Sequence, residues 1–275
     1  MIEEAAPAKV NLVLHVGPLR PDGRHDLCTL MASLDLADEV AVEPAPAGPD
    51  EVICPGVEGP NLAAAAVAAY REAVGGELPP LRVTIEKRVP VAAGLGGGSA
   101  DAAAVLRGAN RIAGGRLGPD ELRAVADRLG SDVPSQVEPR HALVAGAGER
   151  VEPIDLPPMA LVLVPAGKGL ATADVYAEAD RIGAVRDRLD EAAVRALAGR
   201  PLDELAGAVE NDLEPAALSL RPELGDTLAA VRAAGALAAR VSGSGPTVFG
   251  VYADGEAARA ATERLPAAIA TGLRS

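Results

Sequence analysis

The sequence predicts an α+β fold built from two domains, and three observations carry this prediction. The chain has 275 residues, and a prior of roughly 150 residues per domain favours two domains. Stretches with period-two hydrophobicity and stretches with helical periodicity are mixed in both halves of the chain. A Pro-rich, loop-like region over 139–158 then precedes a new strand. We therefore expect two domains, residues 1–155 and residues 156–275.

The elements expected in the first half follow from periodicity and punctuation. Period-two alternation indicates the strands, Pro-Asp-Gly marks the turn, and Asn61 is a suitable N-cap for the first helix. The third helix has Pro near its start and Gly at its end. In chain order they are a strand over 8–17, a turn over 20–26, a strand over 38–45, a helix over 61–74, a strand over 81–90, a helix from Ser99 or Asp101 to 114, and a helix over 118–130.

The second half is expected to begin with an apolar strand and to end with a helix. Its elements are a strand over 159–167, helices over 172–198, 202–209 and 222–235, a strand, glycine turn and strand over 239–254, and a closing helix from 255 onwards.

Composition excludes some classes of function. The net charge is −13 and aromatic residues make up 1% of the chain, whereas broad nucleic-acid binding uses a basic face and stacking aromatics. The N-terminal stretch MIEEAAPAKVNL is acidic, unlike a secretory signal, and no apolar run approaches the ~18 residues of a membrane span. Cys28 and Cys54 lack metal-site spacing and are expected to be idle thiols. We expect a cytoplasmic protein that binds neither membranes nor nucleic acid.

The stretch PVAAGLGGGSADAAAV, residues 90–105, is the strongest local signal. It is a glycine-rich turn that leads directly into a helix. Such a turn leaves backbone N–H groups free at the positive end of the helix dipole, which suits phosphate. A flexible turn without a ligand is the ordinary alternative. The stretch is neither a P-loop, which needs Lys after the glycines, nor a G-x-G-x-x-G dinucleotide fingerprint.

Three stretches in order resemble the motifs of the GHMP kinases. PAKVNLVL (7–14) resembles their N-terminal motif, PVAAGLGGGSADAA (90–103) their central motif, and VSGSGPTVFG (241–250) their C-terminal glycine motif. The resemblance spans nearly the whole chain. It implies an N-terminal domain like domain 2 of ribosomal protein S5, and a ferredoxin-like C-terminal domain.

Further stretches are similar to one branch of these kinases. PAKVNL, RPDGRH, GLGGGSADAA, LGSDVP, GLATADVY and ENDLEPAA together resemble kinases that phosphorylate the 2-hydroxyl of a CDP-linked methylerythritol in the non-mevalonate isoprenoid pathway. The resemblance implies ATP and Mg²⁺ as cofactors and the CDP-linked alcohol as the small-molecule partner. The sequence sets no oligomeric state.

Lys9 and Asp132 match the family's catalytic positions. The resemblance implies that the Asp132 carboxylate takes the proton of the attacking hydroxyl. It also implies that Lys9 keeps the Asp132 carboxylate ionised and stabilises negative charge on the moving phosphoryl group. Only three of the 26 basic residues are lysines, namely Lys9, Lys87 and Lys168. A retained lysine is explained either by a need for a compact point charge or by chance survival. Without the motifs, the favoured interpretation of Asp132 is an N-cap and that of Lys9 is a solvated strand residue, and the motifs reverse this preference.

The resemblance also implies a nucleotide site around the glycine loop. Asn61 and Lys87 match positions on the adenosine side, although Asn61 is also explained as a helix cap, and Ser99 is a candidate Mg²⁺ ligand. The expected ATP-binding residues are Pro90, Val91, Ala92, Ala93, Gly94, Leu95, Gly96, Gly97, Gly98, Ser99, Ala100, Asn61 and Lys87.

The acceptor site is expected around a histidine. The resemblance implies that His25 hydrogen-bonds cytosine and that Tyr176 stacks on it. This chain departs from the family at Arg24, where an aromatic residue is usual; a guanidinium plane can also stack on a base or reach a phosphate. Gly243, Ser244 and Gly245 are expected to pack against the phosphate loop or to hold the substrate, unless they form only a hairpin turn. The expected substrate-binding residues are Asn11, His25, Arg24, Tyr176, Gly243 and Ser244.

Two other readings stay open from the sequence. Arg24 leaves room for a sister GHMP kinase that acts on another small alcohol. A nucleotide-binding regulator without catalysis is the second alternative, and the presence of both Lys9 and Asp132 argues against it.

Overall fold

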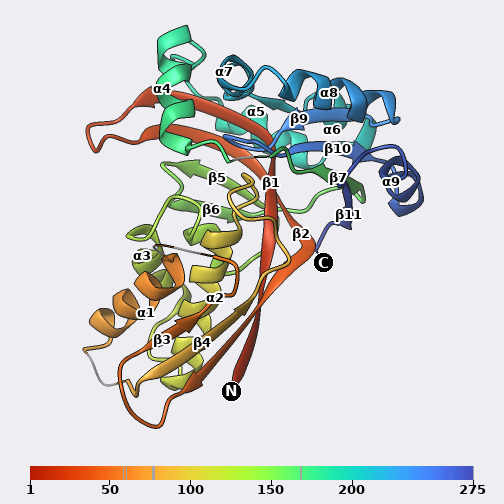
Figure 1. Cartoon of the computed structure of the whole chain (residues 1–275). Coiled ribbons are helices and arrows are strands. Elements are labelled where there is room, and N and C mark those ends of the chain that lie inside the picture. Colours follow the sequence, from red (N-terminus) through yellow and green to blue (C-terminus); the bar gives the residue numbers. More distant parts are fainter. Residues whose placement is uncertain (58, 60, 76–77, 168, 275) are drawn as a thin grey trace. The chain divides into compact units, whose positions relative to one another are not determined.

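The computed structural model describes residues 1–57, 59, 61–75, 78–167 and 169–274. Lys168, one of the three lysines, therefore lies outside the described residues. The elements run in chain order as β1 (Ile2–Leu19), β2 (His25–Pro44), β3 (Glu51–Ile53), α1 (Leu62–Ala73), β4 (Leu81–Glu86), α2 (Gly97–Ile112), α3 (Pro119–Asp127), the 3₁₀ helix η1 (Pro134–Gln136), β5 (Ala142–Gly146), β6 (Arg150–Pro153), β7 (Ala160–Val164), α4 (Thr172–Ile182), α5 (Glu191–Ala198), α6 (Leu202–Gly207), β8 (Glu210–Asn211), α7 (Glu214–Leu220), α8 (Leu224–Ala233), β9 (Ala238–Val241), β10 (Val248–Tyr252), α9 (Gly255–Thr262) and β11 (Ile269–Gly272) (Figure 1).

The chain divides into two compact units that interleave in sequence. The first unit contains residues 1–8, 36–91 and 96–139, and the second contains residues 9–35, 92–95 and 140–275. Strands β1 and β2 each contribute residues to both units. The expected boundary at residue 155 differs from this division, since residues 9–35, 92–95 and 140–155 group with the C-terminal part. Whether residue 155 separates two folding domains stays a prediction.

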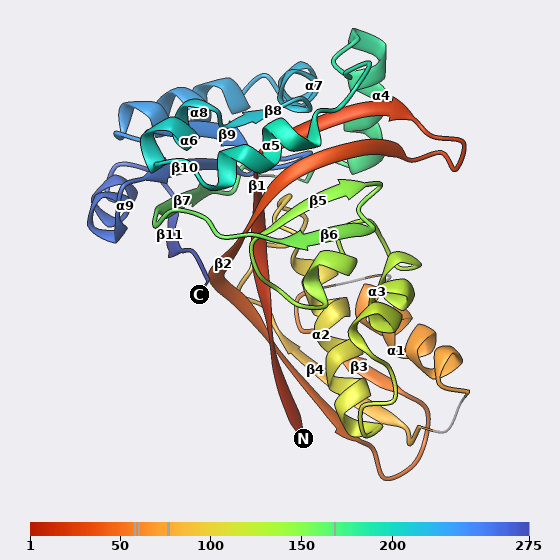
Figure 2. The same ribbon diagram turned by 180° about the vertical axis from the view of Figure 1, so that it is seen from behind.

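The first unit packs helices on a small sheet. The C-terminal part of β2 pairs antiparallel with β4, and β3 pairs parallel with the other side of β4. Leu81, Val83 and Ile85 of β4 are fully buried while the residues between them are exposed, which confirms the period-two pattern. Helices α1 and α2 lie side by side in both views (Figures 1 and 2). Each large aliphatic side chain buried here contributes about 1.5–3 kcal/mol.

The second unit contains an antiparallel sheet with the strand order β11-β7-β10-β9. When the four strands of this sheet are numbered in chain order as β7, β9, β10 and β11, their order in the sheet is 4-1-3-2. Helices α8 and α9 pack against these strands. The order β-α-β-β-α-β with this pairing is the ferredoxin-like arrangement, so the expected C-terminal fold is confirmed. The hairpin of β5 and β6 pairs with the N-terminal part of β2 in the same unit.

Two expectations for these elements are wrong. Residues 139–158 were expected to be a loop, but they contain β5 and β6. Every residue of β5 is buried, so the strand has no period-two alternation. The neighbouring prolines also favoured the prediction of a loop. The helix from 255 does not close the chain, because β11 follows it and pairs with β7. Among the described residues, no helix is both long and apolar enough to cross a bilayer.

The close packing of α2 on β2 yields a test of the first unit. A Cβ added to Gly108 would lie 2.7 Å from Val42 Cγ2. We expect Gly108→Ala to lower the free energy of unfolding by about 1–3 kcal/mol, as over-packing does, although Ala is the better helix former. Gly225→Ala, on α8 with open space around it, is the matched control and should stabilise by about 0.4–1 kcal/mol. Urea unfolding measures both, and a Gly108→Ala protein as stable as the parent contradicts the packing argument.

Candidate active site

The glycine loop is anchored at its start by the glycine turn that follows β9. Gly94 has φ +73°, and a Cβ there would lie 2.6 Å from the carbonyl oxygen of Gly245 and 2.7 Å from that of Ser242. Backbone cannot yield as a flexible side chain can, so only glycine fits this position. The Ser242 hydroxyl donates to the Gly94 carbonyl at 2.9 Å, and the Thr247 N–H donates to the Ala93 carbonyl at 3.2 Å. The expectation that the C-terminal glycine turn packs against the loop is confirmed at Gly245.

The side chain of Asn211 holds that glycine turn by two hydrogen bonds, a role that was not predicted from the sequence. Its side-chain amide is buried and donates to the carbonyls of Val241 and Gly243 at 2.9 and 2.8 Å. Its Oδ1 accepts from the Leu213 N–H. The stretch ENDLEPAA contributed to the family resemblance, but a buried asparagine has no periodic signal that would assign it this role.

Lys9 lies against the loop and the glycine turn. It is 5% exposed on β1, and its backbone N–H donates to the Leu95 carbonyl at 2.9 Å. Its Nζ donates to Asn11 Oδ1 at 2.8 Å, and Asn11 Nδ2 donates to Thr29 Oγ1 at 2.7 Å. A Cβ on Gly243 would lie 3.4 Å from Asn11 Oδ1 and 3.8 Å from Lys9 Nζ. Lys9, Asn11 and Gly243, three expected site residues, are thus brought together in the second unit. Lys9 is not a solvated strand residue.

The second part of the loop opens helix α2, which begins at Gly97, two residues earlier than its expected start at Ser99. Its N-cap is Gly96 with φ +70°, no side chain caps it, and the first turn contains no acidic residue. The first intrahelical bond runs from the Ala100 N–H to the Gly96 carbonyl. Positive φ recurs at Ala92, Gly94 and Gly96. Left-handed residues interspersed in this way turn backbone N–H groups toward one side, an arrangement suited to anions. Ala92 is in a strained conformation for a residue with a side chain.

Asn61 and Lys87 also lie near this helix start in the first unit. Asn61 caps α1 by accepting from the Ala63 N–H at 2.8 Å, so the helix-cap explanation is confirmed. The next residue, Leu62, contacts the position of a Cβ on Gly98. A Cβ on Gly97 would lie 3.3 Å from Lys87 Nζ. Contact of Asn61 and Lys87 with adenosine stays a prediction.

Asp132 belongs to the first unit, in the turn before η1. It is half-buried, and its backbone carbonyl accepts from the Ser135 hydroxyl at 2.8 Å. Lys9 belongs to the second unit. The meeting of the Lys9 ammonium and the Asp132 carboxylate therefore stays a prediction.

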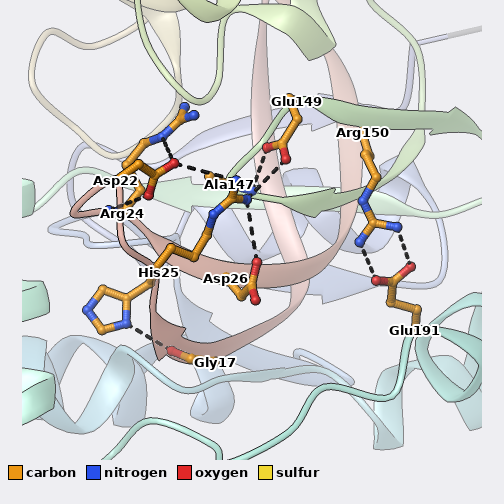
Figure 3. Close-up of polar contacts among 10 residues, drawn as sticks. Gly17, Asp22, Arg24, His25, Asp26, Ala147, Glu149, Arg150 and Glu191 are labelled. Carbon is orange, nitrogen blue, oxygen red and sulfur yellow. Dashed lines mark hydrogen bonds and ion pairs between the residues drawn. The ribbon is translucent and has the colours of Figure 1, made fainter.

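His25 and Tyr176 are brought together in the second unit, as expected. Their ring centroids are 5.3 Å apart with a tilt of 35°. The His25 Nδ1–H donates to the Gly17 carbonyl at 2.9 Å (Figure 3), which leaves Nε2 as the ring nitrogen that faces Asp180. Nε2 lies 3.3 Å from Asp180 Oδ2. The orientation of the His25 imidazole is thus fixed, and the half-buried ring of Tyr176 lies beside it.

Arg24 and its turn are held by carboxylates. The Arg24 N–H donates to Asp22 Oδ1 at 3.1 Å, and Arg24 Nε donates to Asp22 Oδ2 at 3.4 Å (Figure 3). Arg20 donates to Glu149 Oε1 at 3.0 Å and lies within 3.5 Å of Asp22. Hydrogen bonding from the Arg24 N–H lowers the pKa of Asp22. The contact from Glu149 could not be predicted from the sequence, because Glu149 lies in the β5–β6 hairpin, where a loop was expected.

Comparison with known proteins agrees with this geometry. The family model for the N-terminal domain of GHMP kinases matches residues 61–138, and the model for their C-terminal domain matches residues 191–271. A 4-diphosphocytidyl-2-C-methyl-D-erythritol kinase from Anaeromyxobacter dehalogenans is 48% identical, over 93% of this chain and 82% of the relative. One from Streptomyces coelicolor is 44% identical, over 92% of this chain and 88% of the relative.

Solved structures point the same way. A crystal structure of 4-(cytidine 5'-diphospho)-2C-methyl-D-erythritol kinase matches with a TM-score of 0.82 and 37% identity over the full length of both chains. Homoserine kinase from Cytophaga hutchinsonii matches with a TM-score of 0.71 at 18% identity, over 99% of this chain and 94% of that one, which shows the fold alone. The chain is thus an ATP-dependent small-molecule kinase that belongs to the GHMP kinases, and within them to the family of the 4-diphosphocytidyl-2-C-methyl-D-erythritol kinases.

Proposed function

We propose that the protein transfers the γ-phosphoryl group of ATP to the 2-hydroxyl of 4-diphosphocytidyl-2-C-methyl-D-erythritol. The observation that carries the proposal is the buried Lys9 ammonium, held by Asn11 against the glycine turn at Gly243, on a strand bonded to the glycine loop. The names of the relatives supply the acceptor. A cytoplasmic location fits Cys28 and Cys54, which are both unpaired thiols.

The glycine loop is the proposed seat of the triphosphate. The uncapped N-terminus of α2 presents free N–H groups and a partial positive charge, and the positive-φ residues before it allow the backbone to approach phosphate oxygens. An acidic chain can bind an anionic nucleotide in this way, because the local donors rather than the net charge act at contact distance.

Lys9 and Asp132 are the proposed catalytic pair. The acceptor oxygen attacks the γ-phosphorus, the bond from that phosphorus to the β,γ-bridging oxygen breaks, and ADP leaves. The hydroxyl proton passes to the Asp132 carboxylate. Lys9 stabilises the negative charge on the moving phosphoryl group, and Asn11 keeps the ammonium oriented without adding charge of its own.

Mg²⁺ is the proposed metal cofactor and arrives with the nucleotide. Kinases commonly hold it with phosphate oxygens and one or two protein oxygens. Within the described part of the chain, no three His, Cys, Asp or Glu side chains gather into a metal cage, so the residues fit a cation carried mainly by phosphate. Ser99, half-buried on the first turn of α2, is the candidate protein ligand. When bound, Mg²⁺ would supply positive charge that neutralises the phosphate groups of the nucleotide.

His25 and Tyr176 are proposed to bind the cytosine. With Nδ1–H committed to Gly17, Nε2 is the ring nitrogen left for the base, and it would bind the base in exchange for its contact with Asp180 at 3.3 Å. The Tyr176 ring supplies a face for stacking. Arg24, next to His25 and 38% exposed at its side chain, is proposed to cover the base or to reach the diphosphate. Gly243 and Ser244 are proposed to contact the alcohol end.

The catalytic pair can be tested by substitution. Asp132→Asn should lower kcat by about 10²–10⁴-fold, because it removes the proton acceptor, and should leave the Kd for ATP unchanged. Lys9→Met should also lower kcat strongly. Coupled-enzyme detection of ADP measures turnover, and calorimetric titration measures ATP binding. Full turnover in either variant contradicts its assigned role.

The loop anchor can be tested with a pair of glycine substitutions. Gly94→Ala should cost at least about 2 kcal/mol of unfolding free energy, since it adds a backbone clash and a left-handed strain. Gly98→Ala, where only Leu62 is near, should stay within about 0.5 kcal/mol of the parent. Thermal unfolding measures both. Equal melting temperatures would show that the Gly94 contact does not support the loop.

The acceptor site can be tested by comparing substrates. The parent should turn over the CDP-linked alcohol and not homoserine or mevalonate, and His25→Ala should raise KM for the CDP-linked alcohol about tenfold or more. Arg24→Tyr should keep activity if Arg24 covers the base, and Arg24→Ala should raise KM. Turnover of another small alcohol, with none of the CDP compound, would establish a sister kinase instead.

A further inference from the structure

A buried ionic cluster lies directly beneath the start of α2 and has no part in the mechanism above. Its members are Lys87, Asp38 and Asp101, all in the first unit. Asp38 lies on β2, Lys87 follows β4 and Asp101 lies in α2, so the cluster joins three elements. Asp38 is fully buried, Asp101 is 3% exposed, and the Lys87 side chain is 14% exposed.

Asp38 holds the segment that enters the glycine loop. Its Oδ1 accepts from the backbone N–H groups of Arg88 at 2.6 Å and Val89 at 2.8 Å. Its Oδ2 accepts from Lys87 Nζ. These bonds fix the residues immediately before Pro90, where the loop begins.

Asp101 holds the segment that leaves the loop. It is the fifth residue of α2, and its Oδ2 accepts from Lys87 Nζ at 2.7 Å. The same ammonium would lie 3.3 Å from a Cβ on Gly97, the first residue of the helix. Lys87 therefore links the two carboxylates and supports the helix start from below.

The cluster contains two carboxylates and one ammonium, so it has an excess of negative charge, unlike a simple ion pair of one acid and one base. Two carboxylates share one ammonium, and Asp101 Oδ1 is buried without a hydrogen-bond partner. Burial, with a contribution from Asp38, raises the pKa of Asp101 to about 6 despite the hydrogen bond from Lys87. Burial lowers the pKa of Lys87, but its bonds to Asp101 and Asp38 outweigh this and raise it. Such a cluster contributes little net stability compared with an apolar core, so its tethering geometry is its best-supported role.

We propose that Lys87, Asp38 and Asp101 form a clamp that fixes both stems of the glycine loop and thereby positions it for the triphosphate. The proposal rests on the phosphate-binding role proposed for the loop. These three are positioning residues, since they act through the backbone of residues 88–97. The role proposed here for Lys87, which is to position the loop, differs from the direct contact with adenosine that the family resemblance implies.

The test compares three substitutions at Asp101 in the full chain. Asp101→Ala removes the tether and should raise KM for ATP about tenfold or more, because a misplaced loop weakens its contacts with phosphate. KM for the CDP-linked alcohol should not change. Asp101→Asn keeps an oxygen that accepts from Lys87 and should recover most of the affinity for ATP. Lys87→Met with Asp101→Leu replaces the pair with apolar groups and should still show the raised KM, while its melting temperature reports the cost of leaving the buried Asp38 without the ammonium.

Controls separate positioning from general destabilisation. Glu4→Gln disturbs the pair of Glu4 with Arg107, which joins β1 to the middle of α2. It should change the melting temperature without changing KM for ATP. GTP should lose affinity by the same factor as ATP in Asp101→Ala, whereas a lost contact of Lys87 with adenine would change the ratio of the two. An unchanged KM for ATP in Asp101→Ala, or a changed ratio, would overturn the clamp.

A pH profile gives an independent readout. Because the pKa of Asp101 is raised in the folded state, its contribution to stability is present below the ordinary Asp pKa and is lost as pH rises through about 6. The groups facing it are Lys87, Asp38 and the half-buried Cys54 thiol, whose pKa burial also raises. The difference in stability between the parent and Asp101→Asn should therefore change between pH 4 and pH 6; a constant difference contradicts the buried-charge argument. If the parent itself produces no ADP, the proposed function fails, and the clamp is rejected with it.

Discussion

The contact of Gly94 with the backbone of Ser242 and Gly245 is the constraint on which the rest of the site depends. Two segments about 150 residues apart in sequence approach so closely that no side chain fits between them. This approach sets the position of the loop carbonyls, and the Leu95 carbonyl in turn accepts from the backbone of Lys9. The buried Lys9, the start of the glycine loop and the C-terminal glycine turn are thus ordered by one backbone contact, and Asn211 holds the glycine turn through the Val241 and Gly243 carbonyls.

The two described lysines show two ways of burying a cation. Lys9 donates to the neutral amide of Asn11, which orients the ammonium and adds no charge. Lys87 donates to two carboxylates, which more than cancel its charge. The first arrangement suits a group that must attract a phosphoryl oxygen, and the second suits a group that must stay in place. The scarcity of lysine in an Arg-rich chain is consistent with both, since each arrangement uses the ammonium as a compact point charge that Arg's planar fork does not imitate.

The sequence predicted what depends on local pattern and missed what depends on distant partners. Period two identified β4, the glycine run located the start of α2 within two residues, and Asn61 was recognised as a cap. The buried strand β5 was missed because it does not alternate, and Asn211 because its bonds run to residues 30 and 32 positions away. Lys87 was assigned to the nucleotide by motif alone. Its carboxylate partners lie 49 and 14 residues away, and only the folded chain brings them together.

The departure at Arg24 is best understood through the turn that presents it. Arg20 braces this turn by donating to Glu149 of the neighbouring hairpin and by its contact with Asp22, and these two contacts do not involve Arg24. The backbone that orients His25 is therefore fixed independently of the residue at position 24. A change from an aromatic ring to a guanidinium leaves the His25 bond to Gly17 and the contact with Tyr176 in place. In the proposed cytosine site, Arg24 would then supply a planar cation where an aromatic residue is usual, beside the imidazole and the Tyr176 ring.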